Sequence, residues 1–160
     1  MQVIEPAALA AAGPADLDAL VARRGFTLVL GDGDLRGVPA AIALFADYTI
    51  LRPAARLTID APETWAGAVW RIGRRAIALP ETLTADEAQV RGLIDEISEA
   101  SAEQWLAGRS TLALDSAAEL IRRRGGDLVE RTEFARLFAA GEPQQGLAAF
   151  LRKTRPDFRR

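Results

Sequence analysis

A short apolar run enclosed by two glycines sets the first constraint on the fold. Residues 26–30 read Phe-Thr-Leu-Val-Leu, with a glycine directly before and after them. A compact apolar run bounded in this way predicts a buried β-strand. The segment 40–45 is apolar on every face, which predicts a deeply buried helix whose first turn contains Pro39. The aromatic and β-branched run 48–51 predicts a second strand, ending before Pro53.

The rest of the chain carries mainly the signals of helices. A helix is expected after Pro14, and residues 31–37 are expected to form a loop. Thr84 and Glu87 have the spacing of a capping box, so a helix begins there, and Gly92 ends it. Further helices are expected around Trp105 and over residues 113–121, 134–138 and 147–151, with breaks at Gly125-Gly126, Gly141 and Pro156.

Strands early and helices late predict an α/β fold with a helical C-terminal section. The chain has 160 residues, a length that suits one domain. We expect residues 1–100 to form an α/β core and residues 101–160 to form a helical region of the same domain, which serves oligomerisation and ligand contact.

The composition excludes several kinds of chemistry. The sequence contains no histidine and no cysteine. A Ser-His-Asp hydrolase, a thiolate nucleophile, a disulfide framework and a conventional zinc site are therefore excluded. Acid–base work must fall to aspartate, glutamate, Lys153 or Tyr48. The charges nearly balance, with 20 basic and 22 acidic residues, which argues against a nucleic-acid partner.

The apolar runs also bear on location. None reaches the roughly 18 residues that a membrane span requires. The first residues lack the basic segment of a secretory signal. We therefore expect a cytoplasmic protein without a membrane partner.

The glycine-rich segment 31–37 is the first candidate site. It reads Gly-Asp-Gly-Asp-Leu-Arg-Gly and lies between the first predicted strand and the buried helix. Its spacing differs from the dinucleotide fingerprint, and Asp32 and Asp34 would repel a pyrophosphate. A tight strand-to-helix turn is the expectation. A backbone oxyanion hole at the helix start and a small nucleotide-binding module stay open as alternatives.

Other charged and aromatic residues have two interpretations each. Glu63 follows Pro62, so it either complements a helix dipole or transfers protons. Trp65, Val69 and Ile72 have helical spacing and are expected in the core or an interface. Two clusters are basic. Arg122 to Arg124 are expected to be solvated and to neutralise a helix end, and residues 152–155 with Arg159 and Arg160 form either a solvated tail or a polyanion site.

Three stretches match the motifs of one known family in order and spacing. Residues 26–57 have its strand, glycine-bearing turn, small-residue helix and following strand. Residues 84–94, with Thr-Ala-Asp-Glu-Ala and Gly-Leu-Ile, are close to its pattern SAEEA…GLV. Residues 146–158 are similar to its closing pattern EGxxAFLEKRxPxF and are the most specific of the three. Over residues 26–158 the chain resembles the enoyl-CoA hydratase/isomerase (crotonase) superfamily.

The resemblance implies a fold, a substrate class and roles for residues. The fold is the ClpP/crotonase spiral, shortened at the N-terminus. The substrate is an acyl-CoA thioester, so coenzyme A is part of the substrate and no separate cofactor is implied. Two backbone N–H groups stabilise an enolate, and the second comes from the turn at Gly37 and Val38. Glu63, in a Pro-Glu pair with Gly67 four residues later, matches the family's acid/base. Phe150 and Lys153 match positions that contact the adenine and phosphate end of coenzyme A.

Two departures leave the activity open. Ala41 stands where hydratases carry their other glutamate, and the family's N-terminal portion is shortened or absent. A shortened sheet exposes an edge, so we expect a trimer-based homo-oligomer or a hetero-oligomer with another acyl-CoA enzyme. If active, the protein is an enoyl-CoA isomerase, hydratase or lyase. The alternative is a non-catalytic subunit that supports a full-length crotonase.

Overall fold

The computed structural model describes residues 1–123 and 127–158 in two compact units. The first, called here the sheet unit, contains residues 2–23 and 27–99. The second, called here the helical unit, contains residue 1, residues 24–26 and the described residues from 100 onward. The expected break at Gly125-Gly126 and the cations Arg124, Arg159 and Arg160 lie outside the described residues.

A parallel sheet forms the centre of the sheet unit. Its strand order is β1 (Gln2–Ile4), β2 (Thr27–Gly31), β4 (Tyr48–Leu51) and β7 (Glu96–Ile97). Both predicted strands are confirmed, and they are direct neighbours, with Leu28 opposite Tyr48. Every residue of β2 is buried, which explains its uninterrupted apolar sequence.

A smaller sheet lies in the same unit and corrects one prediction. It has the order β3 (Asp34–Leu35), β5 (Arg56–Thr58) and β6 (Thr82–Thr84). The expectation that residues 31–37 form only a loop is wrong, because β3 lies within them and pairs with β5. Strands of two or three residues carry almost no periodic signal, so β1, β3 and β6 depend on their partners rather than on local sequence.

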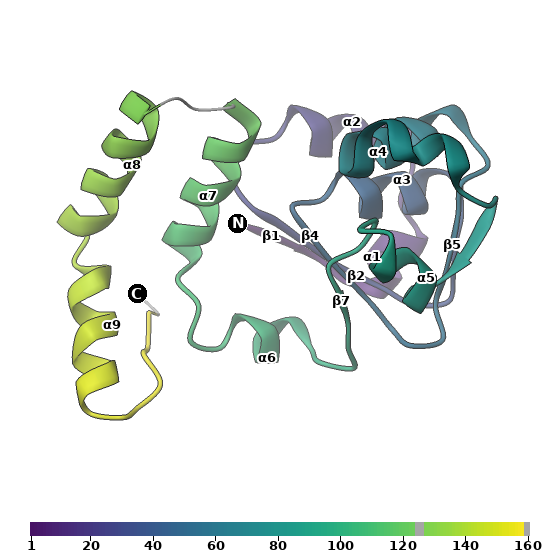
Figure 1. The fold of residues 1–160 in the computed structure, drawn as a ribbon. Coiled ribbons are helices and arrows are strands. Elements are labelled where there is room, and N and C mark those ends of the chain that lie inside the picture. The colour runs from purple at the N-terminus through teal and green to yellow at the C-terminus, as the bar shows by residue number, and fades with distance from the viewer. Residues whose placement is uncertain (124–126, 159–160) are drawn as a thin grey trace. The chain divides into compact units, whose positions relative to one another are not determined.

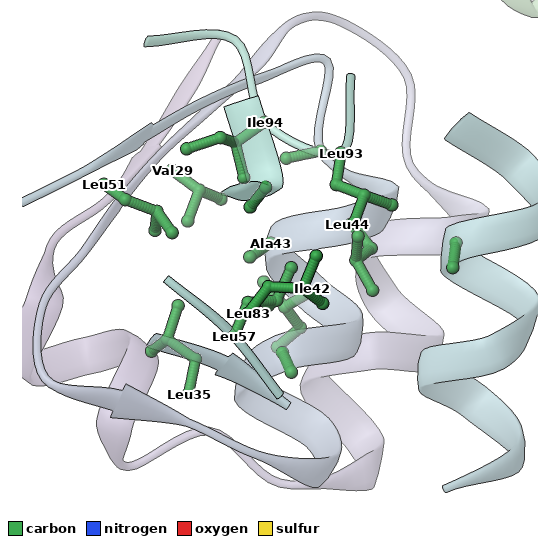
Figure 2. Packing of buried hydrophobic residues seen from close by; sticks show 14 of the residues in the cluster. Val29, Leu35, Ile42, Ala43, Leu44, Leu51, Leu57, Leu83, Leu93 and Ile94 are labelled. Atoms are coloured by element: carbon green, nitrogen blue, oxygen red, sulfur yellow. The ribbon is translucent and has the colours of Figure 1, made fainter. Parts of the chain in front are cut away.

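In the sheet unit three further helices, α1 (Pro6–Ala10), α2 (Pro14–Ala22) and α4 (Pro62–Ile72), pack against α3 (Gly37–Phe45). Residues 40–44 of this helix are buried, which confirms the expected deeply buried helix. Figure 2 shows Ile42, Ala43 and Leu44 among apolar side chains of both sheets. The other helices are the 3-10 helix η1 (Gly73–Ala78) and α5 (Ala85–Val90).

The capping box predicted for α5 is present. The Glu87 amide donates to Thr84 Oγ1 (3.3 Å), and the Thr84 amide donates to the Glu87 carboxylate (2.9 Å). The hydrogen bonds from the Thr84 amide and hydroxyl lower the pKa of Glu87. Gly92, with φ of 79°, follows the helix as expected.

The stripe Trp65, Val69 and Ile72 on α4 is only partly core. Ile72 is 8% exposed, but Trp65 and Val69 are 38% and 51% exposed. Trp65 and Val69 are therefore not core residues of the sheet unit, and for these two positions the interface stays a prediction. The reason is that the other face of α4, with Gly67 and Ala68, packs against α3.

The helical unit contains α6 (Ala102–Leu106), α7 (Thr111–Arg123), α8 (Asp127–Ala139) and α9 (Glu142–Leu151). Figure 1 shows α7 in green, followed by α8 and α9 toward the yellow end of the chain. All four predicted helices are confirmed. None of the helices within residues 1–123 and 127–158 is long and apolar enough to cross a membrane.

The prediction that Arg122 is solvated is wrong. Its guanidinium donates to the carbonyl oxygen of Gly25 (2.8 Å) and forms an ion pair with Glu119 (3.7 Å). The Gly25 amide in turn donates to Glu119 (3.2 Å). Arg122 therefore anchors the segment before β2 to α7 inside the helical unit.

Gly67 lets α4 approach α3 closely, and this generates a first prediction. A Cβ at residue 67 would lie 2.6 Å from Leu44 Cβ, which is closer than real Cβ contacts allow. Gly67→Ala should therefore lower the free energy of unfolding by about 1–3 kcal/mol, as other overpacked cores do. Urea denaturation measures the change.

Gly146→Ala is the matched control. Gly146 also lies within a helix, but a Cβ there meets only Phe158 at 3.9 Å. This variant should be neutral or more stable by up to about 1 kcal/mol, because alanine has the higher helix propensity. Equal stability effects of the two substitutions would contradict the close approach at Gly67.

Candidate active site

The first turn of α3 is built to present backbone N–H groups. Gly37 has φ of 51°, a conformation that glycine adopts without steric cost. Val38 does not share it, because Lys153 alone among the described non-glycine residues has a positive φ. Pro39 has no N–H, so the amides of Gly37, Val38 and Ala40 are the donors of this turn.

These amides suit an anionic oxygen. The first N–H groups of a helix have no acceptor within the helix, and the helix dipole adds partial positive charge there. The strand pair β3–β5 fixes the approach to the turn, with the Arg56 amide donating to the Gly33 carbonyl (2.9 Å). The Val38 position is therefore compatible with the expected oxyanion donor.

Glu63 occupies the first turn of α4, directly after Pro62. The start of this helix is fixed by Thr64, whose hydroxyl accepts from the Ala61 amide (3.0 Å) and donates to the Ala61 carbonyl (2.7 Å). The Glu63 side chain is half-buried. Such a carboxylate is accessible to a ligand while its backbone is held by the helix cap.

Val38 and Glu63 belong to two helices that pack together. The first turns of α3 and α4 carry one residue each, and both helices lie in the sheet unit. Contact between the helices includes the close approach of Gly67 to Leu44. The fold thus places the donor turn and the candidate acid/base on adjoining elements.

Ala41 lies one turn after Val38 and is fully buried. Its methyl group therefore belongs to the core, at the position for which the resemblance implies a glutamate in hydratases. Among the described residues, no group of three or more aspartate or glutamate side chains is placed to hold a metal ion.

Phe150 and Lys153 lie at the end of α9, in the helical unit. Phe150 is 78% exposed, and Lys153 is exposed as well. The Lys153 amide donates to the Phe150 carbonyl (3.0 Å), and the Thr154 amide donates to the Ala149 carbonyl (3.0 Å). This pattern is a Schellman motif, in which glycine normally occupies the position that Lys153 takes with φ of 54°.

Basic residues surround this helix end. Arg152 and Arg155 line a hollow of about 570 Å³ between the last turns of α9 and the following segment. The Arg152 Nε donates to the Ala148 carbonyl (3.1 Å), so part of its guanidinium serves the helix C-terminus. The hollow also contains Gln144, Gln145, Ala148, Ala149, Thr154, Pro156 and Asp157.

The sequence interpretation missed the pair Arg71–Asp95. The Arg71 guanidinium forms two hydrogen bonds with the Asp95 carboxylate, at 2.9 Å and 3.1 Å. Only the spacing of Glu63, Gly67 and Arg71, four residues apart on one helix face, points to a shared role. Asp95 follows the Gly-Leu-Ile motif and has no local signal of its own.

Comparison with known proteins adds a sequence relative. No family profile matches the chain. A curated enoyl-CoA-hydratase of Amycolatopsis orientalis is 34% identical over 112 residues, which are 61% of this chain and 51% of that protein. The chain therefore spans about half the length of this relative.

Solved structures share the fold. Enoyl-CoA hydratase subunit I of Geobacillus kaustophilus HTA426 is similar with a TM-score of 0.68 and 23% identity, over 91% of this chain and 66% of that one. An enoyl-CoA hydratase/isomerase from Mycobacterium abscessus is similar with a TM-score of 0.68 and 25% identity, over 89% and 65%. The expected crotonase fold is confirmed. Together with the sequence relative and the ordered motifs, this fold supports membership of the enoyl-CoA hydratase/isomerase (crotonase) superfamily.

Proposed function

We propose that this chain binds an acyl-CoA thioester and transfers a proton on its acyl group. The observation that carries the proposal is the pairing of a glycine-led donor turn on α3 with a carboxylate in the first turn of the adjoining α4. The relative named enoyl-CoA-hydratase supports the same substrate class. The Val38 amide is the proposed oxyanion donor, Gly37 shapes the turn, and Glu63 is the proposed acid/base.

The chemical step follows from these two groups. The Glu63 carboxylate removes a proton from the carbon beside the thioester carbonyl or from its vinylogous position. The electron pair of the broken C–H bond moves onto the thioester oxygen, and the amide of Val38 stabilises that negative charge. Glu63 then returns the proton, at another carbon if a double bond moves. One removed oxyanion donor typically costs a factor of about 10² to 10³ in rate.

Ala41 favours isomerisation over hydration. The usual hydration mechanism uses two carboxylates, one to activate water and one to supply the proton. In this chain the first position carries a buried methyl group. A single carboxylate suffices to shuttle a proton between two carbons.

Phe150 and Lys153 are the proposed contacts for the adenine and phosphate end of coenzyme A. Both side chains are exposed at the end of α9, and Arg152 and Arg155 add positive charge there. The resemblance implies that this end contacts coenzyme A across a subunit boundary, so we propose a trimer-based homo-oligomer or a hetero-oligomer with another acyl-CoA enzyme. We propose further that it acts in the cytoplasm and takes no separate cofactor.

A second candidate function is a non-catalytic subunit of a larger acyl-CoA enzyme. Ala41 removes one of the two carboxylates that the usual hydration mechanism uses. Such a subunit would keep the fold and bind a full-length crotonase or another enzyme of the same pathway. The two functions differ in whether Glu63 matters.

Glu63→Gln tests the catalytic function. The amide keeps the size of the side chain but cannot take up a proton, so turnover of an enoyl-CoA should fall about 10²- to 10⁴-fold. Spectrophotometric assays of isomerisation and hydration provide the measurement. Glu81→Gln, at an exposed residue outside α3 and α4, is the matched control and should keep full activity.

The same variants separate the subunit function. If wild type is inactive alone but raises the rate of a co-purifying crotonase, and Glu63→Gln raises it equally, the chain is a supporting subunit. Full activity of Glu63→Gln in isolation would remove Glu63 from the mechanism.

Lys153→Gly separates binding from stability. Glycine removes the cost of about 1–2 kcal/mol that an L-residue pays in the left-handed region, so the melting temperature should rise. Affinity for coenzyme A should nevertheless fall about tenfold, because one charge-assisted hydrogen bond is lost. Calorimetric titration and thermal denaturation give the two values.

Arg131→Ala is the control for this change, since Arg131 is an exposed cation on α8. It should leave the affinity unchanged. A Lys153→Gly protein that binds coenzyme A as tightly as wild type would contradict the proposed contact.

A further inference from the structure

A single arginine joins three elements of the sheet unit. Arg71, in the last turn of α4, donates through Nε to the carbonyl of Leu44 (3.0 Å). Its Nη2 donates to the carbonyl of Ala46 (2.9 Å) and to Thr49 Oγ1 (3.1 Å). Its Nη1 donates to both oxygens of Asp95. All three nitrogens of the guanidinium are therefore engaged as donors.

The acceptors of Arg71 are groups that need a partner. The last carbonyl groups of a helix receive no hydrogen bond from an N–H group of the same helix. The helix dipole is also negative at this end. Leu44 and Ala46 lie at the end of α3, so Arg71 caps α3 from the neighbouring helix. The Asp95 carboxylate also accepts from the Thr49 amide (2.7 Å), which ties the pair to β4.

The arrangement is shielded from solvent. The side chain of Arg71 is 11% exposed and that of Asp95 is 27% exposed. Ion pairs in such surroundings are screened by salt much less than exposed pairs. The Arg71–Asp95 pair therefore holds its two residues in a fixed arrangement. It differs in this from the exposed Arg52–Glu99 pair, whose glutamate is 75% exposed.

Arg71 shares a helix face with the proposed acid/base. Glu63, Gly67 and Arg71 are four residues apart, and residues at this spacing lie on one face of a helix. Gly67 makes the close approach to Leu44, and Arg71 binds the carbonyl of the same residue. The face of α4 that begins with Glu63 is thus held on α3 at two successive turns.

We propose that Arg71, held by Asp95, is a positioning residue for Glu63. This inference rests on the proposed function. Arg71 lies about 12 Å along the helix axis from Glu63, at 1.5 Å per residue, so it acts through the placement of α4. Because α3 carries the donor turn and α4 the carboxylate, loss of the five hydrogen bonds changes the distance between the two reacting groups. A misplacement of about 1 Å can cost on the order of 10²-fold in rate.

Arg71→Lys is the first test. Lysine keeps the positive charge but has three donors on a single nitrogen, so it cannot reach all four acceptor groups that Arg71 binds through three nitrogens. We expect kcat for enoyl-CoA isomerisation to fall about 10- to 100-fold, while KM changes less than threefold. Asp95→Asn, which keeps an acceptor for the Thr49 amide, should change both values in the same direction.

Arg74→Lys is the matched control. Arg74 is an exposed arginine in η1, three residues further along the chain. Its replacement should leave kcat and KM at their wild-type values. In every variant kcat is divided by the folded fraction, measured by circular dichroism at the assay temperature, so that loss of stability is not mistaken for loss of positioning.

Amide hydrogen exchange tests the positioning without substrate. The amides of residues 64–67 in α4 should exchange at least threefold faster in Arg71→Lys than in wild type or Arg74→Lys. Unchanged exchange together with unchanged kcat would overturn the inference. If Arg71→Lys does not fold, Thr49→Val, which removes one acceptor, must show the faster exchange, and its absence would overturn the inference equally.

The two proposals fail in different ways. A wild-type protein that neither binds nor turns over an enoyl-CoA refutes the proposed function, whatever the exchange rates are. Wild-type turnover with an Arg71→Lys protein that is folded and equally fast refutes only the role of Arg71.

Discussion

The burial of α3 is the constraint on which the sheet unit depends. Its alanines at 40, 41 and 43 are fully buried, and side chains this small let strands and helices approach the helix axis closely. Gly67 extends the same principle to α4, where a single added carbon would collide with Leu44. Close packing of this kind leaves α3 few alternative positions, so the donor turn at its start is fixed by the core behind it (Figure 2).

In the candidate site, the groups that would react and the groups that hold the helices in place are different residues. The donor turn and Glu63 stand at the starts of two helices, where backbone N–H groups and side chains reach a ligand. The opposite end of the pair is closed by Arg71, which satisfies carbonyls that α3 leaves open. Hydrogen bonds at the C-terminal ends of α3 and α4 thus hold the relative position of the donor turn and Glu63 at their N-terminal ends.

Much of the fold was predictable where the local sequence carries a physical signal. The run 26–30 has the length and composition of a buried strand, and the Thr84–Glu87 spacing allows reciprocal hydrogen bonds. The short strands β1, β3 and β6 were not predictable, because two or three residues have no periodicity. Trp65 and Val69 show a second limit, since helical spacing defines a face but not whether that face packs in the core of the chain.

The sequence by itself determined the available chemistry and carried the resemblance to a family. Without histidine or cysteine, acid–base work falls to carboxylates, Lys153 or Tyr48, and three ordered motifs resemble those of the crotonase superfamily. Only the tertiary structure decided which residues support Glu63. Arg71 and Asp95 are separated by 23 intervening residues, and their pairing depends on α4 crossing the end of α3 beside β4. The sequence does not specify which of its distant charges will pair. An ion pair between distant segments is therefore fixed only when the fold brings them together.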